Sequence, residues 1–410
     1  MVAIERASRI LMYSHDTFGL GHLRRTRAIA HSLVRQNPNL SVLILTGSPI
    51  IGSFDFSSRV DFVRIPGVIK LRNGDYTSLK LHMDIEETLA MRASIIKHTA
   101  EAFDPDLFIV DKEPLGLRGE VEHTLHMLKD MGVPLVLGLR DVMDDPDLLE
   151  PEWERKGAMP ALENLYDEIW VYGLPQICKP LDGMHVPESV LRKMVYTGYL
   201  EREVPSEAIK PYIISKFDPP YLLVTPGGGG DGDLMVDWVL RAYENHKNLP
   251  YPALIVFGPF MQSEQQNAFD ERINKLEDVE ALSFDAHMES LMDNAAAIVA
   301  MGGYNTFCEI LSFNKPAMII PRTRPRMEQF IRASSAQSLG LVSMLEDDNE
   351  RRPDTMATAL RQLPQQKRPS DVVVPGLMDG LDSVNRLTQK HLDTRAKNRE
   401  TAATLSQISG

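Results

Sequence analysis

Short apolar runs alternate with longer amphipathic segments along this chain. The runs, such as 106–110 and 295–300, have the length and composition of strands that are buried on both faces of a sheet. The segments between them carry apolar residues at helical spacing, as Ala28, Ile29 and Leu33 do, which is typical of helices that cover a sheet. Repeated alternation of strand and helix predicts an α/β fold with doubly wound, Rossmann-like parallel sheets.

The alternation is interrupted once, by a polar segment that contains Pro205 and Pro211. Prolines among polar residues favour a linker, and strand–helix units begin again after it. At 410 residues the chain is long enough for two domains of ordinary size. The expected order is an N-terminal domain over 1–200, a linker over 201–216, a C-terminal domain over 217–375, a helix over about 376–392 and a flexible tail over 397–410.

Composition limits the classes of partner. Hydrophobic residues make up 43% of the chain and charged residues 25%, as in a globular protein with a packed core. The net charge is −13 and no long basic run occurs, which argues against nucleic acid as the main partner.

The same residues predict a compartment. Only Cys178 and Cys308 are present, far apart in the sequence, so a disulfide framework is not expected and a reducing environment fits. The first residues lack a signal-peptide core, and no apolar run approaches the ~20 residues of a membrane span. We expect a cytoplasmic protein, with peripheral contact at the inner face of a membrane left open.

The most informative motif follows the apolar run 295–300. Gly302 and Gly303 come next, then Asn305 and Thr306 as a cap pair, then an amphipathic segment that carries Glu309. Strand, glycine turn and helix place backbone N–H groups at the carboxyl end of a strand, where α/β sheets hold phosphates. About one turn into the helix, the Glu309 carboxylate can reach a ribose hydroxyl pair. The alternative is a plain turn with a capped helix, but the ordered set favours a nucleotide site.

A second glycine loop follows the apolar run 221–225. A turn needs one or two glycines, whereas a loop that lies against a diphosphate can use more. We therefore expect phosphate contact from the four consecutive glycines Gly227, Gly228, Gly229 and Gly230.

In the N-terminal half, a strand runs into a loop with Gly19 and Gly21, and a helix follows. His22 stands at the entrance of this helix, where the helix dipole helps to keep the imidazole neutral and able to act as a base. The alternative is a capping or packing histidine. Arg24 and Arg25 are candidates for contact with a phosphate or an anionic acceptor, or are solvated helix charges.

Asp111 and Glu113 follow the apolar run 106–110. Carboxylates at the carboxyl end of a buried strand suggest a site, where they would bind acceptor hydroxyls or assist as a base; alternatively, Asp111 only caps the turn. Asp-x-Asp, a pattern that can hold a divalent cation, occurs three times, at 104–106, 145–147 and 231–233. Repeated matches in an acidic chain are expected by chance, so we predict no metal.

The segment from Gly302 to Gln329 resembles the nucleotide-sugar site of glycosyltransferases of the MurG type, glycosyltransferase family 28. That family has a glycine turn, a helix glutamate, a strand that ends in proline and a polar pair after it. Here these positions hold Glu309, Pro321 and the pair Glu328 and Gln329. The family often has two glutamines in that pair, so Glu328 is a departure.

The loop with Gly19, Gly21 and His22 is similar to the first-domain loop of the same enzymes, in which the histidine lies near the acceptor and the donor phosphate. Its continuation, Leu23-Arg24-Arg25, looks more like that of nucleotide-sugar hydrolases with the same fold.

The resemblance implies the GT-B arrangement, two Rossmann-like domains that face a cleft, with the last helix returning to the first domain. The second domain would hold a nucleotide sugar, most often UDP-linked. Its glycine loops and Gly21 would lie against the donor, Glu309 would bind the ribose, and Glu328 and Gln329 would touch the sugar hydroxyls. The first domain would supply His22 as the base and an acceptor groove. Such enzymes usually invert the anomeric centre without a metal or other cofactor.

Three functions remain open from the sequence. The first is transfer of a hexosyl group from a nucleotide sugar to a lipid or small-molecule acceptor. The second is hydrolysis or epimerisation of a nucleotide sugar, which the same fold supports. The third is non-catalytic binding of a nucleotide sugar.

Overall fold

The structure is a computed structural model, and the chain divides into two compact units. One unit comprises 1–174, 180–200 and 379–410, and the other comprises 175–179 and 201–378. The residues that the structure describes are 6–16, 21–71, 75–204, 220–227, 230–258, 261–283 and 288–409.

The first unit is built on a sheet of seven strands that are all parallel. Their spatial order is β3 (Val60–Arg64), β2 (Leu40–Thr46), β1 (Ser8–Ser14), β6 (Leu107–Asp111), β7 (Leu135–Arg140), β8 (Glu168–Tyr172) and β9 (Met194–Tyr196). The central pair β1 and β6 is in register from Ile10 with Leu107 to Tyr13 with Val110. All four of these side chains are buried, as the continuous apolar runs predict for strands covered on both faces.

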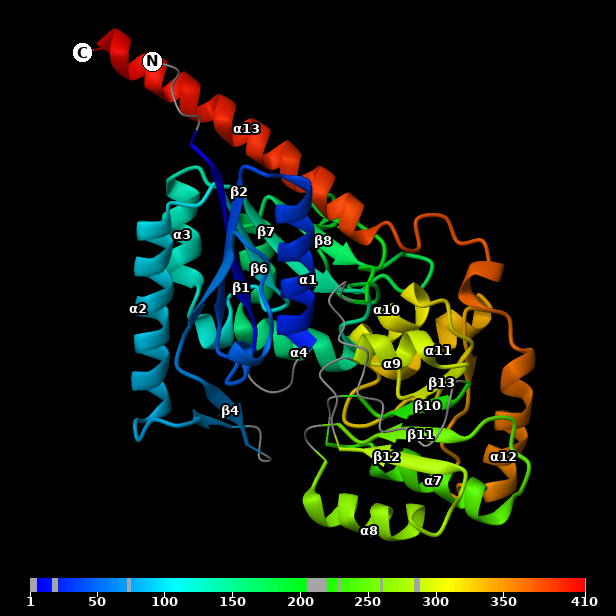
Figure 1. Cartoon of the computed structure of the whole chain (residues 1–410). Helices are drawn as coiled ribbons and strands as arrows, with labels where there is room; N and C mark the ends of the chain where they lie inside the picture. Colours follow the sequence, from blue (N-terminus) through cyan, green and yellow to red (C-terminus); the bar gives the residue numbers. More distant parts are fainter. Residues whose placement is uncertain are drawn as a thin grey trace. The chain divides into compact units, whose positions relative to one another are not determined.

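Helices cover both faces of this sheet. Their bounds are α1 (Gly21–Gln36), α2 (Ile85–Phe103), α3 (Glu122–Asp130), α4 (Pro146–Lys156), α5 (Ala158–Asn164), α6 (Glu188–Leu191) and α13 (Gly380–Ser409). Figure 1 shows α2 and α3 together on one face of the sheet, and α1 with α13 on the other. A separate hairpin of β4 (Val68–Lys70) and β5 (Tyr76–Ser78) lies outside the sheet.

Helix α13 joins the first unit through polar contacts along its length. Asn385 donates to the Ser32 hydroxyl at 2.8 Å, and Arg399 pairs with Asp106 at 2.6 Å. The helix expected to end at about residue 392 continues to Ser409, and the flexibility expected from residue 397 stays a prediction. The segment holds no glycine or proline before Gly410 and is rich in good helix formers. No helix in the described ranges is long and apolar enough to cross a membrane, α13 included.

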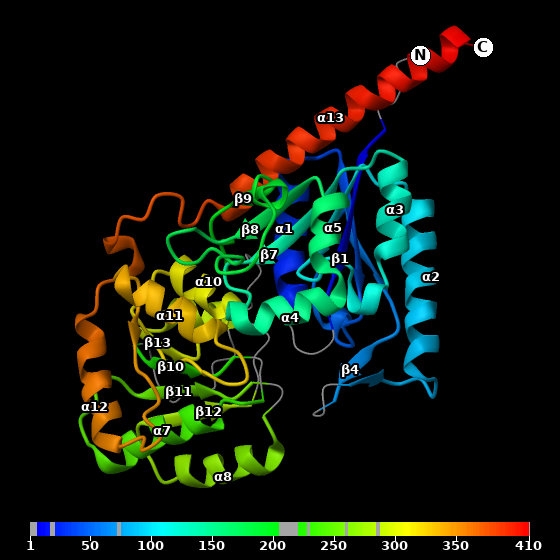
Figure 2. The same cartoon turned by 180° about the vertical axis from the view of Figure 1, so that it is seen from behind.

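The second unit repeats the plan with a sheet of six parallel strands. Their spatial order is β12 (Val279–Leu282), β11 (Ala253–Val256), β10 (Leu222–Thr225), β13 (Ala297–Ala300), β14 (Ala317–Ile319) and β15 (Ser343–Met344). The helices are α7 (Asp233–Asn245), α8 (Ser263–Ile273), α9 (Met288–Asn294), α10 (Tyr304–Ser312), α11 (Glu328–Ser338) and α12 (Pro353–Gln362). Figure 2 shows α7, α8 and α12 on one face of this sheet and α10 and α11 on the other. The prediction of two doubly wound α/β sheets is confirmed.

Each sheet reverses its strand order once. In the first unit, β1 continues to β2 on one side, while its neighbour β6 continues to β7 on the other. In the second unit the same reversal separates β10 from β13. The chain segments that leave such a pair diverge, so a crevice opens at the carboxyl ends of the two strands, where α/β proteins bind ligands. The loops after β1, β6, β10 and β13 are therefore the candidate sites, and they carry the predicted motifs.

Gly380, the first residue of α13, lies where no side chain fits. A Cβ atom there would overlap the backbone of Gly198 and Tyr199, and the Gly380 N–H donates to the Tyr199 carbonyl at 3.2 Å. We expect Gly380→Ala to lower the free energy of unfolding by about 1–3 kcal/mol, as overpacking does. Urea unfolding measures this loss. Gly52→Ala is the matched control, because nothing lies within 4 Å of a Cβ atom at Gly52; equal losses in both variants would contradict the argument.

Candidate active site

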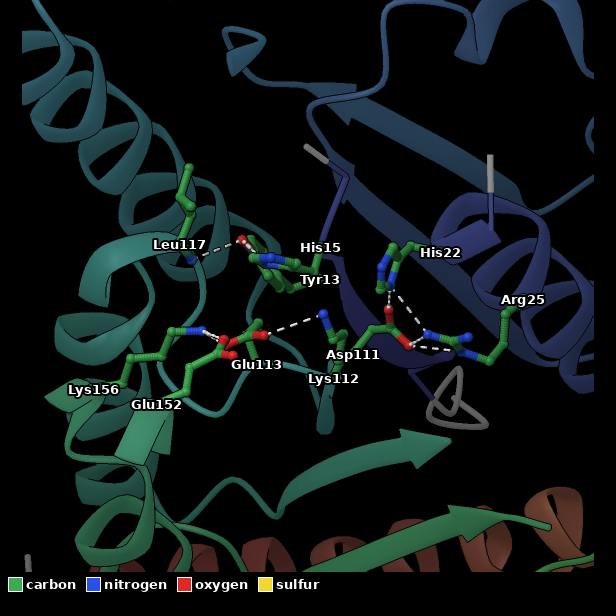
Figure 3. Close-up of polar contacts among 10 residues, drawn as sticks. All are labelled: Tyr13, His15, His22, Arg25, Asp111, Lys112, Glu113, Leu117, Glu152 and Lys156. Carbon is green, nitrogen blue, oxygen red and sulfur yellow. Dashed lines mark hydrogen bonds and ion pairs between the residues drawn. The ribbon is translucent and has the colours of Figure 1, made fainter. Parts of the chain in front are cut away.

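The first candidate site is formed by His22 at the start of α1 and Asp111 at the end of β6. The His22 Nδ1 atom lies 2.5 Å from Asp111 Oδ2 (Figure 3). An ionised carboxylate only accepts hydrogen bonds, so Nδ1 carries the proton of this contact. The other ring nitrogen, Nε2, is then the one that can accept a proton, as a general base must. The two residues meet because β1, which leads into α1, and β6 are neighbours at the strand reversal.

Arg25 follows His22 by three residues, so both side chains leave the same face of α1. Its Nε and Nη2 atoms donate to Asp111 Oδ1 at 2.9 and 2.6 Å, and Nη2 lies 3.1 Å from His22 Nδ1. The Arg25 side chain is only 2% exposed. Its guanidinium therefore faces a carboxylate inside the protein, whereas the sequence left open an anionic ligand or solvent. Arg24 is half-buried, and its contact with an acceptor or phosphate stays a prediction.

Burial and neighbouring charges set the protonation states. Burial alone would raise the pKa of Asp111, but Arg25 and His22 hold it well below its usual range. The pKa of His22 is lowered, first by burial and further by Arg25 and Lys112, although Asp111 opposes this shift. At neutral pH the pair is therefore a carboxylate and a neutral imidazole, the state in which His22 can take a proton.

Asp16, just after β1, fixes the start of α1. Its carboxylate accepts the Leu23 backbone N–H at 3.1 Å and the Thr46 hydroxyl at 2.5 Å. This contact satisfies one of the N–H groups that a helix start leaves open and holds the first turn, with His22, in place. An Asp shortly before a helix is the sequence signal that could have identified this role.

A second buried histidine lies beside the first. His15 follows β1, and its ring centroid is 5.6 Å from that of His22 in an edge-on arrangement. The Tyr13 hydroxyl lies 3.4 Å from His15 Nδ1 and donates a hydrogen bond to Glu120 Oε1 at 2.5 Å. Glu120 in turn forms an ion pair with Arg92. Burial holds the pKa of His15 well below its ordinary value. The sequence analysis missed this network, because its members are far apart in the chain.

Glu113 lies apart from the His22 group (Figure 3). Its carboxylate is paired with Lys156 at 2.8 Å and with Lys112 at 3.3 Å. Burial raises the pKa of Glu113. The charges of Lys112, His15 and Lys156 outweigh this effect and hold the pKa well below its usual range. Glu113 is thus occupied by two lysines, whereas Asp111 contacts His22, so the geometry favours Asp111 as the partner of the base.

In the second unit, the glycine loops meet at the reversal between β10 and β13. Gly227 and Gly302 have φ values of 86° and 78°, in the region that favours glycine. A Cβ atom on Gly302 would overlap the Ile319 side chain, so close packing also requires glycine there. Gly230 is exposed, and Gly228 and Gly229 lie outside the described residues, as does Gly19 in the first unit.

Helix α10 starts one residue after Gly303, which is its N-cap. Asn305 and Thr306 are thus in the first turn rather than at the cap that the sequence predicts. The Asn305 side-chain oxygen accepts from Arg202 Nη2 at 3.1 Å. Glu309 lies in the second turn and is only 2% exposed. The sequence places it correctly on the helix, and its contact with a ribose stays a prediction.

The polar pair Glu328 and Gln329 opens α11, and both residues are buried. Arg322 contacts each of them: its Nη2 lies 3.1 Å from Glu328 Oε1, and its backbone N–H donates to Gln329 Oε1 at 3.1 Å. Arg322 also pairs with Asp231, after the glycine loop, at 2.5 Å. The loop after β10 and the start of α11 are therefore tied together by one arginine.

Arg332 is a buried residue of α11 that the sequence analysis missed. Its Nη1 donates to the Gly302 carbonyl at 3.0 Å, and its guanidinium lies 5.8 Å from the centroid of the Tyr304 ring. These contacts stabilise the turn between β13 and α10.

Residues 223–370 match the glycosyltransferase family 28 C-terminal domain. The match runs from β10 to the segment after α12 and contains the glycine turn, Glu309, Glu328 and Gln329. The chain is a glycosyltransferase whose second unit contains a family 28 C-terminal domain. The resemblance of the segment from Gly302 to Gln329 is thus confirmed. A comparison with curated proteins gives no match.

Solved structures show the GT-B fold for this glycosyltransferase. It is similar to UGT2 of Phytolacca americana in complex with UDP-2-fluoro-glucose and pterostilbene, with a TM-score of 0.61 and 14% identity over 98% of this chain and 99% of that chain. It is also similar to the glycosyltransferase of kitacinnamycin, with a TM-score of 0.57 and 14% identity over 96% and 99% of the two chains. MurG of Acinetobacter baumannii gives a TM-score of 0.52 and 14% identity over 95% and 99%.

Within the ranges that the structure describes, no group of three or more His, Cys, Asp or Glu side chains is placed to hold a metal ion. The prediction that the reaction needs no metal or other cofactor stays a prediction.

The buried pairing of Asp111 predicts a pH-dependent stability. Since its folded-state pKa is depressed below the ordinary 3.8, its contribution is complete above that value and is lost as the pH falls toward the folded-state pKa. We expect Asp111→Asn to cost about 3–5 kcal/mol of unfolding free energy at pH 7, because Arg25 loses its counter-ion. The difference in unfolding free energy between the wild type and Asp111→Asn should become smaller below about pH 4.

Urea unfolding at pH 7 and pH 3 measures this gap. Asp182→Asn is the control, because Asp182 is exposed. This variant should have the same unfolding free energy as the wild type at both pH values. A gap for Asp111→Asn that is the same at both values would show that its carboxylate gains nothing from the pairing.

Proposed function

We propose that this glycosyltransferase moves a hexosyl group from a UDP-linked sugar to a lipid or small-molecule acceptor, with inversion at the anomeric carbon and without a metal. The observation that carries the proposal is the buried contact of His22 with Asp111. It lies at the strand reversal of the first sheet, in a chain whose second unit contains a family 28 C-terminal domain.

The contact supports a single-displacement reaction. The acceptor hydroxyl gives its proton to His22 Nε2 while its oxygen forms a bond to the anomeric carbon. The bond from that carbon to the diphosphate oxygen breaks, and the diphosphate leaves with the electron pair. Asp111 stabilises the imidazolium that forms and holds the ring in the tautomer that leaves Nε2 available. Attack on the face opposite the leaving group inverts the anomeric centre.

The second unit would hold the donor. The turns at Gly227 and Gly302 and the start of α10 lie at the carboxyl edge of the sheet, an arrangement suited to a diphosphate. Glu309 would accept from the ribose hydroxyls, and Glu328 and Gln329 would contact the sugar. In this proposal, backbone dipoles rather than a metal ion offset the charge of the leaving diphosphate.

The nucleotide follows from the sequence resemblance rather than from the fold. One similar structure contains UDP-2-fluoro-glucose, whereas the structure of VinC, also similar, is a complex with dTDP. UDP is preferred here because the segment from Gly302 to Gln329 resembles the MurG type. A lipid acceptor would bring the protein to the inner face of a membrane.

Binding of a donor should stabilise the folded protein. A ligand at 100 times its Kd adds about 2.7 kcal/mol, so the melting temperature should rise with the concentration of one member of a panel of UDP-, GDP-, TDP- and ADP-sugars. Glu309→Ala should abolish the rise relative to its own unliganded baseline. Glu264→Ala, an exposed glutamate in the first turn of α8, should keep it. If no nucleotide sugar raises the melting temperature, the proposed donor site is wrong.

Removal of the base should affect turnover and leave donor binding intact. We expect His22→Gln to lower kcat by about 10²–10⁴-fold, with the same thermal stabilisation by the donor as the wild type. Transfer assays and thermal shifts measure the two effects. Incubation with the donor alone is the second arm: release of free sugar at the rate seen with acceptors would instead favour a nucleotide-sugar hydrolase.

A further inference from the structure

The two oxygens of Asp111 are divided between two side chains. Oδ2 receives the proton of His22 Nδ1, and Oδ1 receives two N–H groups of Arg25 (Figure 3). The exposed fractions of the Asp111, Arg25 and His22 side chains are 7%, 2% and 18%. Charges buried to this degree are weakly screened by solvent, so Arg25 acts on the same imidazole as Asp111 does.

In a pair of His and Asp alone, the carboxylate charge stabilises the imidazolium and strengthens the base. Here the guanidinium brings a positive charge within 3.1 Å of the nitrogen that carries the His22 proton. The other groups that act on His22 are Lys112 after β6 and Asp16 and His15 after β1. The positive charges of Arg25 and Lys112 thus oppose the carboxylates of Asp111 and Asp16 around the imidazole. Asp111, which contacts the imidazole directly, is itself paired with Arg25.

We propose that Arg25 is a positioning residue that holds Asp111 against His22 and offsets its charge, so that the base acts on acidic hydroxyls such as phenols in preference to aliphatic alcohols. This inference rests on the proposed function and adds the class of acceptor. A base of limited strength takes a proton most effectively from a hydroxyl of matching acidity. A phenol, like tyrosine, has a pKa of about 10, whereas an aliphatic hydroxyl is closer to water, at about 15.7.

Arg25 also has a geometric role that is separable from its charge. Nε and Nη2 of Arg25 both donate to Asp111 Oδ1. The other oxygen, Oδ2, is left directed at His22. Arg25→Lys keeps the positive charge but loses the fork. Arg25→Gln keeps a donor for Asp111 and removes the charge. Arg25→Met is a second neutral variant, with an apolar side chain, for use if the glutamine variant does not fold.

The first test reads His22 directly and needs no substrate. The full chain is labelled with [13Cε1]histidine and titrated by NMR, and His22→Gln identifies the His22 signal. We expect the neutral variants at Arg25 to raise the pKa of His22 by about one unit or more, and Arg25→Lys to leave it close to that of the wild type. A purely structural role would not move this titration, so an unchanged pKa in a folded neutral variant overturns the inference.

The second test reads acceptor preference. The donor that gives the largest thermal shift is offered with 4-nitrophenol, 4-methylphenol and benzyl alcohol, and kcat/KM is measured for each. The wild type should favour the phenols, and the ratio of 4-methylphenol to benzyl alcohol should fall at least about tenfold in Arg25→Gln. An equal ratio in both proteins, or a wild type that prefers the alcohol, overturns the proposed acceptor class.

The two tests separate this inference from the proposed function. Transfer to any acceptor with an unchanged His22 titration leaves the glycosyl transfer standing and removes the role of Arg25. A raised His22 pKa in a protein that transfers sugar to nothing confirms that Arg25 offsets Asp111, but overturns the acceptor class together with the proposed function.

Discussion

The first unit depends on one buried carboxylate, Asp111. A charge taken out of water must be compensated locally, and at the end of β6 the compensation comes from Arg25 and His22 of α1. The pairing holds α1 against the strand reversal and at the same time fixes the tautomer of His22. Stability and chemistry therefore use the same contact, because the groups that neutralise Asp111 are those that prepare the base.

In the second unit, the turns at the strand reversal depend on glycine rather than on a buried charge. At the reversal between β10 and β13, the backbone turns through positive φ at Gly227 and Gly302, and the neighbouring side chains leave no room for a Cβ atom at Gly302. Buried and half-buried arginines then support the turn from the protein side, with Arg332 on the Gly302 carbonyl and Arg322 between Asp231 and Glu328. These contacts fix the backbone of the turns in place.

Motifs within one segment could be identified from the sequence. The strand, glycine turn and helix around Gly302 and Glu309 form a continuous stretch, and the family match over 223–370 agrees with it. Contacts between distant segments could not be identified in this way. Nothing in the sequence links Arg25 to Asp111, or Tyr13 to Glu120, and the exposed or buried fate of an arginine on an amphipathic helix depends on which strand it meets. The extension of α13 to Ser409 could have been recognised from its helix-forming composition.

The sequence by itself determined the class of fold, the two strand–helix series and the glycine loops, because these follow from local periodicity and from backbone conformations that only glycine adopts readily. It also determined which residues stand at the ends of the central strands. Tertiary structure alone decided what each of them does. The order of strands brought Asp111 to His22, gave Arg25 a buried carboxylate instead of solvent, and set Glu113 between two lysines. Proton affinity depends on neighbours in space, and those neighbours come from helices and strands that are far apart in the sequence.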